Sequence, residues 1–257
     1  MVYLGVISLL AQIPLEVWNK IVMDEPEWQY MRGFLEKYGF GRFSVLMVSA
    51  GLNDYQLKGR AEKVYWPRIK ELLEGKKAPN SLEEMESMLA EFYRNERLAE
   101  QKLKRLNRFL SSSLAKSLWK ASPNETARDF PQIWLKLSEV MQQKPSDKTI
   151  AFAMKTLGLA LLMAWRNDFP IETTIPVDSR IRSFTERLGI SAENDETVKA
   201  FWKEVLERLR ENLPISMIHL DSLVWQIGTL SKAEIVNYFS QLGLRNIGEK
   251  LAEMLKE

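Results

Sequence analysis

The chain of 257 residues contains no cysteine and a single histidine. Without cysteine it has no disulfide, no thiol nucleophile and no cysteine-ligated zinc or iron–sulfur centre, and one histidine leaves too few ligands for a histidine-based metal site. We therefore expect no metal and no cofactor. Any catalysis has to use lysine, carboxylate or hydroxyl groups.

Strand signals are nearly absent as well. No hairpin dipeptide separates two alternating apolar runs, and most windows fit the 3.6-residue period of a helix. Hydrophobic residues make up 46% of the chain, which is enough for a substantial core. The sequence predicts an all-α fold, with helices at about 2–12, 15–22, 27–38, 43–57, 61–74, 82–93, 96–118, 125–141, 147–166, 179–188, 195–212, 216–229, 232–242 and 246–256.

The apolar opening, residues 1–13, has no basic leader and is too short to span a membrane. We expect it to be an interior helix of a soluble, cytoplasmic protein with no membrane partner. Most of the tryptophans are expected to pack in the core, among them Trp18, Trp119, Trp134 and Trp202.

The net charge of +2 argues neither for nor against nucleic acid, but positive charge is concentrated between Arg94 and Lys120, where eight Lys or Arg stand against two Glu. Such a block is either a solvated helix face or a strip that contacts phosphates, and the sequence leaves these readings evenly balanced. The phosphate reading makes candidates of Lys102, Lys104, Arg105 and, elsewhere in the chain, Arg180.

The most informative stretch runs from residue 144 to residue 190. Ser146 or Asp147 can cap a helix there, whose buried face is predicted to carry Ile150, Met154, Leu157 and Leu161. Lys148 then lies in the first turn, where unpaired N–H groups and the positive end of the helix dipole disfavour an ammonium. Downstream, Pro170 and Pro176 keep the chain extended up to Asp178, which is placed to cap a second helix.

These motifs carry a family resemblance. The run Ile-Pro-Val-Asp-Ser-Arg-Ile at 175–181, with Arg-Leu-Gly at 187–189 and a lysine at a preceding helix start, resembles the catalytic segment of helix-hairpin-helix DNA glycosylases. Together with Asp-Lys-Thr-Ile-Ala-Phe at 147–152 and His-Leu-Asp-Ser-Leu-Val-Trp at 219–225, it resembles the archaeal 8-oxoguanine DNA glycosylase (AGOG) family. A Lys-Pro-Ser-Asp turn at 144–147 in place of a Gly-x-Gly turn, and a long lysine-to-aspartate spacing, are features of the same family.

The resemblance implies a single glycosylase domain in which two helical subdomains flank an active-site cleft. A middle subdomain would span about 61–177, and the second would combine about 1–60 with 178–257. The implied partner is DNA containing 8-oxoguanine, and we expect a monomer.

Cutting an N-glycosidic bond builds positive charge at the anomeric carbon, which a carboxylate such as Asp178 would stabilise. A neutral amine such as that of Lys148 would attack the same carbon and form a Schiff base, after which β-elimination cuts the strand. Spacing alone favours blander readings, with Asp178 a plain helix cap and Lys148 an exposed first-turn lysine. The combined motif reverses that preference.

A base flipped out of DNA needs flat walls and polar readers. Phe152, one turn after Lys148, and Trp225 are candidates for the walls, and the resemblance marks Gln29, Trp66 and Asp221 as readers of the base. For His219 we expect a structural role. The reading is a DNA glycosylase with AP-lyase activity on 8-oxoguanine; the alternatives are a related glycosylase for another damaged or mismatched base and a non-catalytic helical DNA-binding protein.

Overall fold

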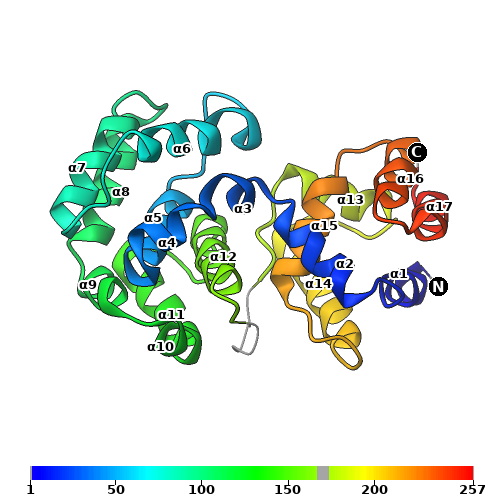
Figure 1. Ribbon diagram of the computed structural model, residues 1–257. Coiled ribbons are helices and arrows are strands. Elements are labelled where there is room, and N and C mark those ends of the chain that lie inside the picture. The colour runs from blue at the N-terminus through cyan, green and yellow to red at the C-terminus, as the bar shows by residue number, and fades with distance from the viewer. Residues whose placement is uncertain (1, 167–173, 257) are drawn as a thin grey trace. The chain divides into compact units, whose positions relative to one another are not determined.

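The computed structural model describes residues 2–166 and 174–256, and every regular element within them is a helix. The all-α prediction is therefore confirmed for this part of the chain. The helices form two compact units, one made of Met1–Glu25 with Glu172–Glu257 and the other of Pro26–Ile171 (Figure 1). The predicted break at 168–170 lies outside the described residues.

The first boundary differs from the one predicted near residue 60, because the helix over residues 40–52 packs along the helix that begins at Lys148. That contact places residues 26–60 in the middle unit. Its elements are α3 (Pro26–Met31), α4 (Phe34–Tyr38), α5 (Phe40–Leu52), the π-helical turn η1 (Ala61–Tyr65), α6 (Trp66–Glu74), α7 (Leu82–Tyr93), α8 (Ala99–Leu110), α9 (Ser113–Lys120), α10 (Pro123–Arg128), α11 (Phe130–Met141) and α12 (Lys148–Met163).

The axis of this middle unit is the pair α5 and α12, which lie side by side (Figure 1). They approach closely at Gly51, where a Cβ atom would stand 2.8 Å from the Cα of Ala153 and 2.6 Å from the hydroxyl of Thr156. The same hydroxyl lies 2.8 Å from the carbonyl oxygen of Met47. Since side chains from Ile150 onward are almost all buried, α12 is a core helix with only its first turn at the surface.

The other unit contains α1 (Val2–Leu10), α2 (Leu15–Met23), α13 (Ser179–Arg187), α14 (Asp195–Leu209), α15 (Met217–Ile227), α16 (Lys232–Gln241) and α17 (Arg245–Met254). Trp18 and Trp202 are fully buried in its core. The indole of Trp202 stacks on Phe184, with ring centroids 6.2 Å apart, and donates a hydrogen bond to Thr185. No single described helix is long and apolar enough to cross a bilayer; residues 4–10 and 15–23 pass that test only as a pair bent by 90°.

Three predicted helices are each divided in two, and in one of them a side-chain cap starts the second helix. The helix predicted at 96–118 stops at Leu110, because Ser112 caps a new helix by accepting a hydrogen bond from the backbone N–H of Ala115. The helix predicted at 125–141 is interrupted at Asp129, just before Pro131, and the one predicted at 27–38 is interrupted at Gly33.

The tryptophan predictions hold in both units. Trp134 is 7% exposed and donates its indole N–H to the carbonyl oxygen of Pro145, while Trp119 is half-buried beneath the guanidinium of Arg42.

His219 has the structural role predicted for it. Its Nδ1 accepts the backbone N–H of Ser216, so Nε2 carries the proton and faces the side-chain oxygen of Asn19 at 3.2 Å. The ring is 5% exposed, and burial lowers the pKa of His219 to about 4. The imidazole is thus neutral in the folded protein and joins α15 to α2.

This burial predicts a pH-dependent loss of stability. The folded pKa lies below that of the unfolded chain, about 6.5, so the unfolded state binds the proton first as the pH falls. The free energy of unfolding should drop by roughly 2–3 kcal/mol between pH 7 and pH 4 on account of this residue. Urea unfolding across that range should show a shallower pH slope for His219→Gln than for the wild type. Equal slopes would contradict the assignment.

Candidate active site

Lys148 is the first residue of α12 and its side chain is exposed. The turn before it is closed by two hydrogen bonds, from the N–H of Lys144 to the carboxylate of Asp147 (3.1 Å) and from the N–H of Asp147 to the carbonyl oxygen of Lys144 (3.0 Å). Asp147 occupies the cap position as predicted, but it turns its carboxylate back to Lys144 and makes no side-chain cap. Lys148 therefore stands at a helix start that the side chain of Asp147 does not cap.

A single guanidinium fixes this helix start. Arg105 on α8 donates to the carbonyl oxygen of Leu52 at the end of α5 (3.2 Å), to Oε1 of Gln143 (2.7 Å) and to the hydroxyl of Thr149 (3.2 Å). These three acceptors come from three separate segments. Arg105 was predicted to contact DNA phosphate; its guanidinium is instead occupied within the protein, and burial lowers its pKa.

The prediction that Lys102 contacts a DNA phosphate is also wrong. Its side chain is fully buried, with Nζ 5.2 Å from the ring centroid of Tyr55 and 6.0 Å from that of Tyr65. Nζ has no hydrogen-bond partner among the residues that the structure describes, and desolvation lowers its pKa. A group in this position does not reach a phosphate. Of the three predicted positions in the basic block, only Lys104 is exposed.

Asp54, just beyond α5, is a candidate site residue that the sequence does not single out. Its carboxylate accepts the indole N–H of Trp66 at 3.1 Å. Burial raises the pKa of Asp54 to about 7, against the opposing effects of that hydrogen bond and of the charges on Lys148, Lys102 and Lys155. The signal was an acidic residue directly after an apolar helix, a pattern too common to single it out.

Trp66 is predicted to hydrogen-bond to a bound base, but in this structure its indole N–H is already bonded to Asp54. The side chain is 0% exposed, its only donor is engaged by Asp54, and its ring meets that of Tyr65 edge to face at 5.3 Å. To bind a base it would have to give up the carboxylate. Its place in this structure is that of a support for Asp54.

Two other predicted residues of this unit remain accessible. Phe152 is half-buried one turn after Lys148, and the ammonium of Lys155 lies 5.7 Å from its ring centroid. Gln29 is exposed on α3, a helix that packs against both α6 and α12. The unit thus brings Gln29, Phe152 and Lys148 onto helices that contact one another.

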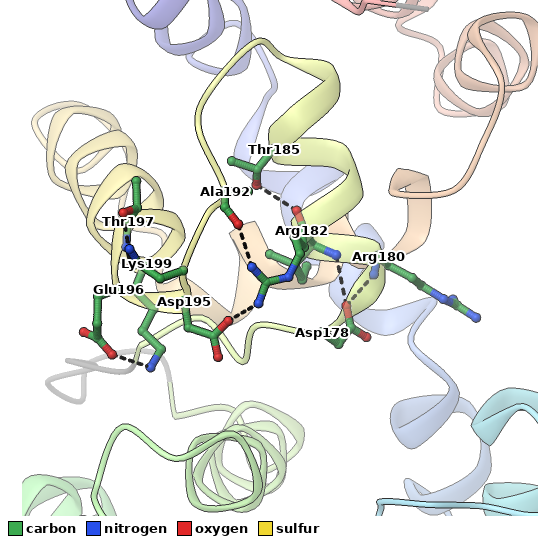
Figure 2. A network of polar contacts seen from close by, with 11 residues as sticks. Asp178, Arg180, Arg182, Thr185, Ala192, Asp195, Glu196, Thr197 and Lys199 are labelled. Carbon is green, nitrogen blue, oxygen red and sulfur yellow. Dashed lines mark hydrogen bonds and ion pairs between the residues drawn. The ribbon is translucent and has the colours of Figure 1, made fainter.

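In the other unit, Asp178 caps α13. Its Oδ1 accepts the backbone N–H groups of Arg180 and Ile181, both at 2.9 Å (Figure 2). Asp178 is therefore a helix cap, as the simpler interpretation of the sequence predicts. The cap uses only one of the two carboxylate oxygens. The bonds hold the carboxylate in a fixed position at the helix start.

Figure 2 also shows how α13 itself is held. Arg182 donates to the carbonyl oxygen of Ala192 at 2.6 Å and pairs with Asp195 at the start of α14. Thr185 donates to the carbonyl oxygen of Ile181 at 2.7 Å. The helix that carries Asp178 is thus tied to its neighbour through its polar side as well as its apolar one.

The guanidinium of Arg180 lies 4.0 Å from the ring centroid of Trp225, which is half-buried on α15. One face of this predicted wall is therefore covered by a cation. Asp221, four residues before Trp225 on the same helix, is 3% exposed. This unit brings together Asp178, Arg180 and Trp225 through the contact between α13 and α15.

Comparison with known structures identifies the fold. The chain resembles the crystal structure of Pa-AGOG in complex with 8-oxoguanosine, an 8-oxoguanine DNA glycosylase from Pyrobaculum aerophilum. The TM-score is 0.76 over 98% of this chain and 96% of that one, at 18% sequence identity. The fold is that of a DNA glycosylase.

Sequence comparison narrows this class to a family. The sequence profile of AGOG, described as N-glycosylase/DNA lyase, matches residues 7–256. An N-glycosylase/DNA lyase of Methanopyrus kandleri is 30% identical over 79% of this chain and 80% of its own, and one of Thermococcus kodakarensis is 27% identical over 72% and 67%. The chain belongs to the AGOG family of N-glycosylase/DNA lyases, so it is an enzyme that acts on DNA.

The hydrogen bonds of Arg105 predict that it matters for stability and little for DNA contact. Arg105→Ala should lower the free energy of unfolding by roughly 2–4 kcal/mol, because three bonds to a cation are lost. Arg105→Lys should recover only part of this, since an ammonium lacks the planar fork that reaches all three acceptors.

The matched control is the exposed neighbour, Lys104→Ala, for which the unfolding energy should change by less than about 0.5 kcal/mol. If Lys104 contacts a phosphate, its removal should flatten the plot of log affinity for plain duplex against log salt by about one unit. A flattened slope for Arg105→Ala with unchanged stability would restore the phosphate reading.

Proposed function

We propose that this enzyme excises 8-oxoguanine from DNA and then cuts the strand by β-elimination, with Lys148 as the nucleophile and Asp178 as the stabilising carboxylate. The observation that carries the proposal is the position of Lys148. It is an exposed amine at the uncapped start of a core helix, in a chain whose family combines glycosylase with lyase activity. The name of the structural relative from Pyrobaculum aerophilum supports the choice of base.

The two residues would divide the work. Departure of the base leaves positive charge on C1′, and the carboxylate of Asp178 offsets it electrostatically. The neutral amine of Lys148 forms a covalent bond to C1′, and the resulting Schiff base acidifies the C2′ proton so that the C3′–O bond breaks.

The base would be held by stacking and read by polar groups. Phe152 and Trp225 are proposed as the walls, and each ring has a cation beside it, Lys155 and Arg180 respectively. Guanine and 8-oxoguanine share the donors N1–H and the exocyclic amine, so a carboxylate such as Asp221 binds both alike. Only the lesion carries a proton on N7, and an acceptor at that place, such as the side-chain oxygen of Gln29, would distinguish it.

The role of Lys148 is tested by trapping the covalent intermediate. Borohydride reduction during turnover on a duplex that contains 8-oxoguanine should trap a protein–DNA adduct, and Lys148→Gln should abolish the adduct while duplex binding survives. The matched control is Lys144→Gln, an exposed lysine one turn earlier. Loss of the adduct in the control and its persistence in Lys148→Gln would show that the nucleophile is another amine.

The choice of base is tested through the two readers. Asp221→Asn replaces an acceptor by a donor opposite the shared edge, so excision of every guanine-derived base should fall by a similar factor, about 10- to 100-fold. Gln29→Ala should reduce the ratio of 8-oxoguanine to guanine affinity, measured with matched duplexes. A ratio that changes in Asp221→Asn and not in Gln29→Ala would reverse the roles. Efficient release of a different lesion, with 8-oxoguanine left intact, would favour a related glycosylase for another base.

A further inference from the structure

Asp54 is a carboxylate that the chemistry above does not use, and it is rigidly mounted. The backbone before it is held by the bond from Arg105 to the carbonyl oxygen of Leu52. The buried side chain of Asn53 donates to the carbonyl oxygen of Lys102 at 3.3 Å. The indole N–H of Trp66 then fixes Oδ2 of Asp54 itself. These contacts determine where the carboxylate sits.

The same guanidinium that holds this segment also holds the residue next to Lys148, through the hydroxyl of Thr149. Arg105 therefore couples the position of Asp54 to that of the α12 start. Asp54 lies two residues after one acceptor of this guanidinium, Leu52, and Lys148 lies one residue before another, Thr149. Burial raises the pKa of Asp54, and the charge of Lys148 is among the effects that oppose that rise.

The charged and titratable groups around Asp54 come from every element packed against it. Lys148 and Lys155 on α12 and Lys102 on α8 supply positive charge. The hydroxyls of Tyr65 in η1 and Tyr93 in α7 are joined by a hydrogen bond of 2.8 Å; burial raises the pKa of both phenols, and the charge of Asp54 adds to the rise. The half-buried carboxylate is thus acted on by cations and by two neutral phenols, and Lys102 lies 6.0 Å from the ring centroid of Tyr65.

We propose that Asp54 accepts the proton that Lys148 must lose before it attacks, either directly or through one water. This inference rests on the proposed role of Lys148. A lysine ammonium has no lone pair, and its surplus proton needs an acceptor of suitable basicity. With a pKa of about 7, Asp54 is half ionised near neutral pH, so it takes up a proton and gives it back readily.

The step balances on a preformed abasic site. A proton passes from Nζ of Lys148 to the carboxylate of Asp54, and the freed lone pair bonds to the C1′ aldehyde carbon. The aldehyde oxygen gains two protons, one of them returned by Asp54, and leaves as water to give the iminium. Loss of the C2′ proton and departure of the 3′ phosphate then break the strand. No oxidant, metal or further reactant is needed.

The test is the single-turnover rate of cleavage of an abasic-site duplex, measured from pH 5.5 to 9.5. In the wild type the rate should rise with pH up to about 7 and then level off, because the carboxylate form is the acceptor. In Asp54→Asn the rate at pH 7.5 should be about 100-fold lower and should keep rising with pH as free amine accumulates, so the deficit shrinks toward pH 9.5. A fold defect would not recover with pH in this way.

Two further variants should shift the plot of cleavage rate against pH without removing the carboxylate of Asp54. Trp66→Phe keeps the ring and loses the N–H, and Lys102→Met removes a buried positive charge; both interactions hold the pKa of Asp54 down. Each variant should therefore move the inflection to higher pH. If Asp54→Asn does not bind plain duplex, that variant is misfolded, and the pH profiles of Trp66→Phe and Lys102→Met then test the proposal without it.

Lys148→Gln in the same assay separates this inference from the proposed function. If Lys148→Gln cleaves at the wild-type rate, the nucleophile itself is wrong. If Lys148→Gln is inactive while Asp54→Asn keeps the wild-type inflection and rate, the nucleophile stands and the role of Asp54 is refuted. An inflection that stays in place in Trp66→Phe and Lys102→Met refutes it equally.

Discussion

The position of Lys148 depends on the hydrogen bonds that Arg105 makes. One planar guanidinium joins the end of α5, the segment after α11 and the first turn of α12. Removing this cation from water has a cost, visible in the lowered pKa of Arg105, and the protein offsets it with three well-directed acceptors. A residue expected from the sequence to contact DNA thus holds the start of α12 in place, and only an arginine has the fork geometry to do so.

That arrangement requires α5 and α12 to lie at a fixed and short distance. The absence of a side chain at Gly51 permits it, since even one methyl group would meet the backbone of Ala153. Close packing makes α12 rigid along its buried length. Because the exposed first turn continues the same helix, its position is restricted as well. A nucleophile mounted on a core helix is placed more reproducibly than one carried on a loop.

Helix periodicity predicted the fold well because most of the chain is amphipathic, and its errors have local causes. A serine that caps a new helix, as Ser112 does, interrupts an apolar pattern without altering it, so the pattern reads as one helix. The unit boundary was misplaced because a contact between α5 and α12, about a hundred residues apart, leaves no trace in either segment. Two of the phosphate candidates, Lys102 and Arg105, are wrong for a different reason: counting charges along α8 ignores which face of the helix each residue lies on. Lys102 shares its face with Leu106 and Phe109, and that spacing predicts burial.

The two carboxylates of the proposed mechanism show why sequence alone does not assign roles. Asp178 accepts two backbone N–H groups on one oxygen, the environment of a fixed negative charge at a helix start. Burial raises the pKa of Asp54 to about 7, although its carboxylate accepts the indole N–H of Trp66, a hydrogen bond that opposes the rise. A site that forms a Schiff base needs both behaviours, a charge that stays to offset the cation at C1′ and a base that exchanges protons with an amine. Chemically identical side chains acquire these functions from what surrounds them, and for Asp54 those surroundings come from α6, α8 and α12, segments that only the fold brings together.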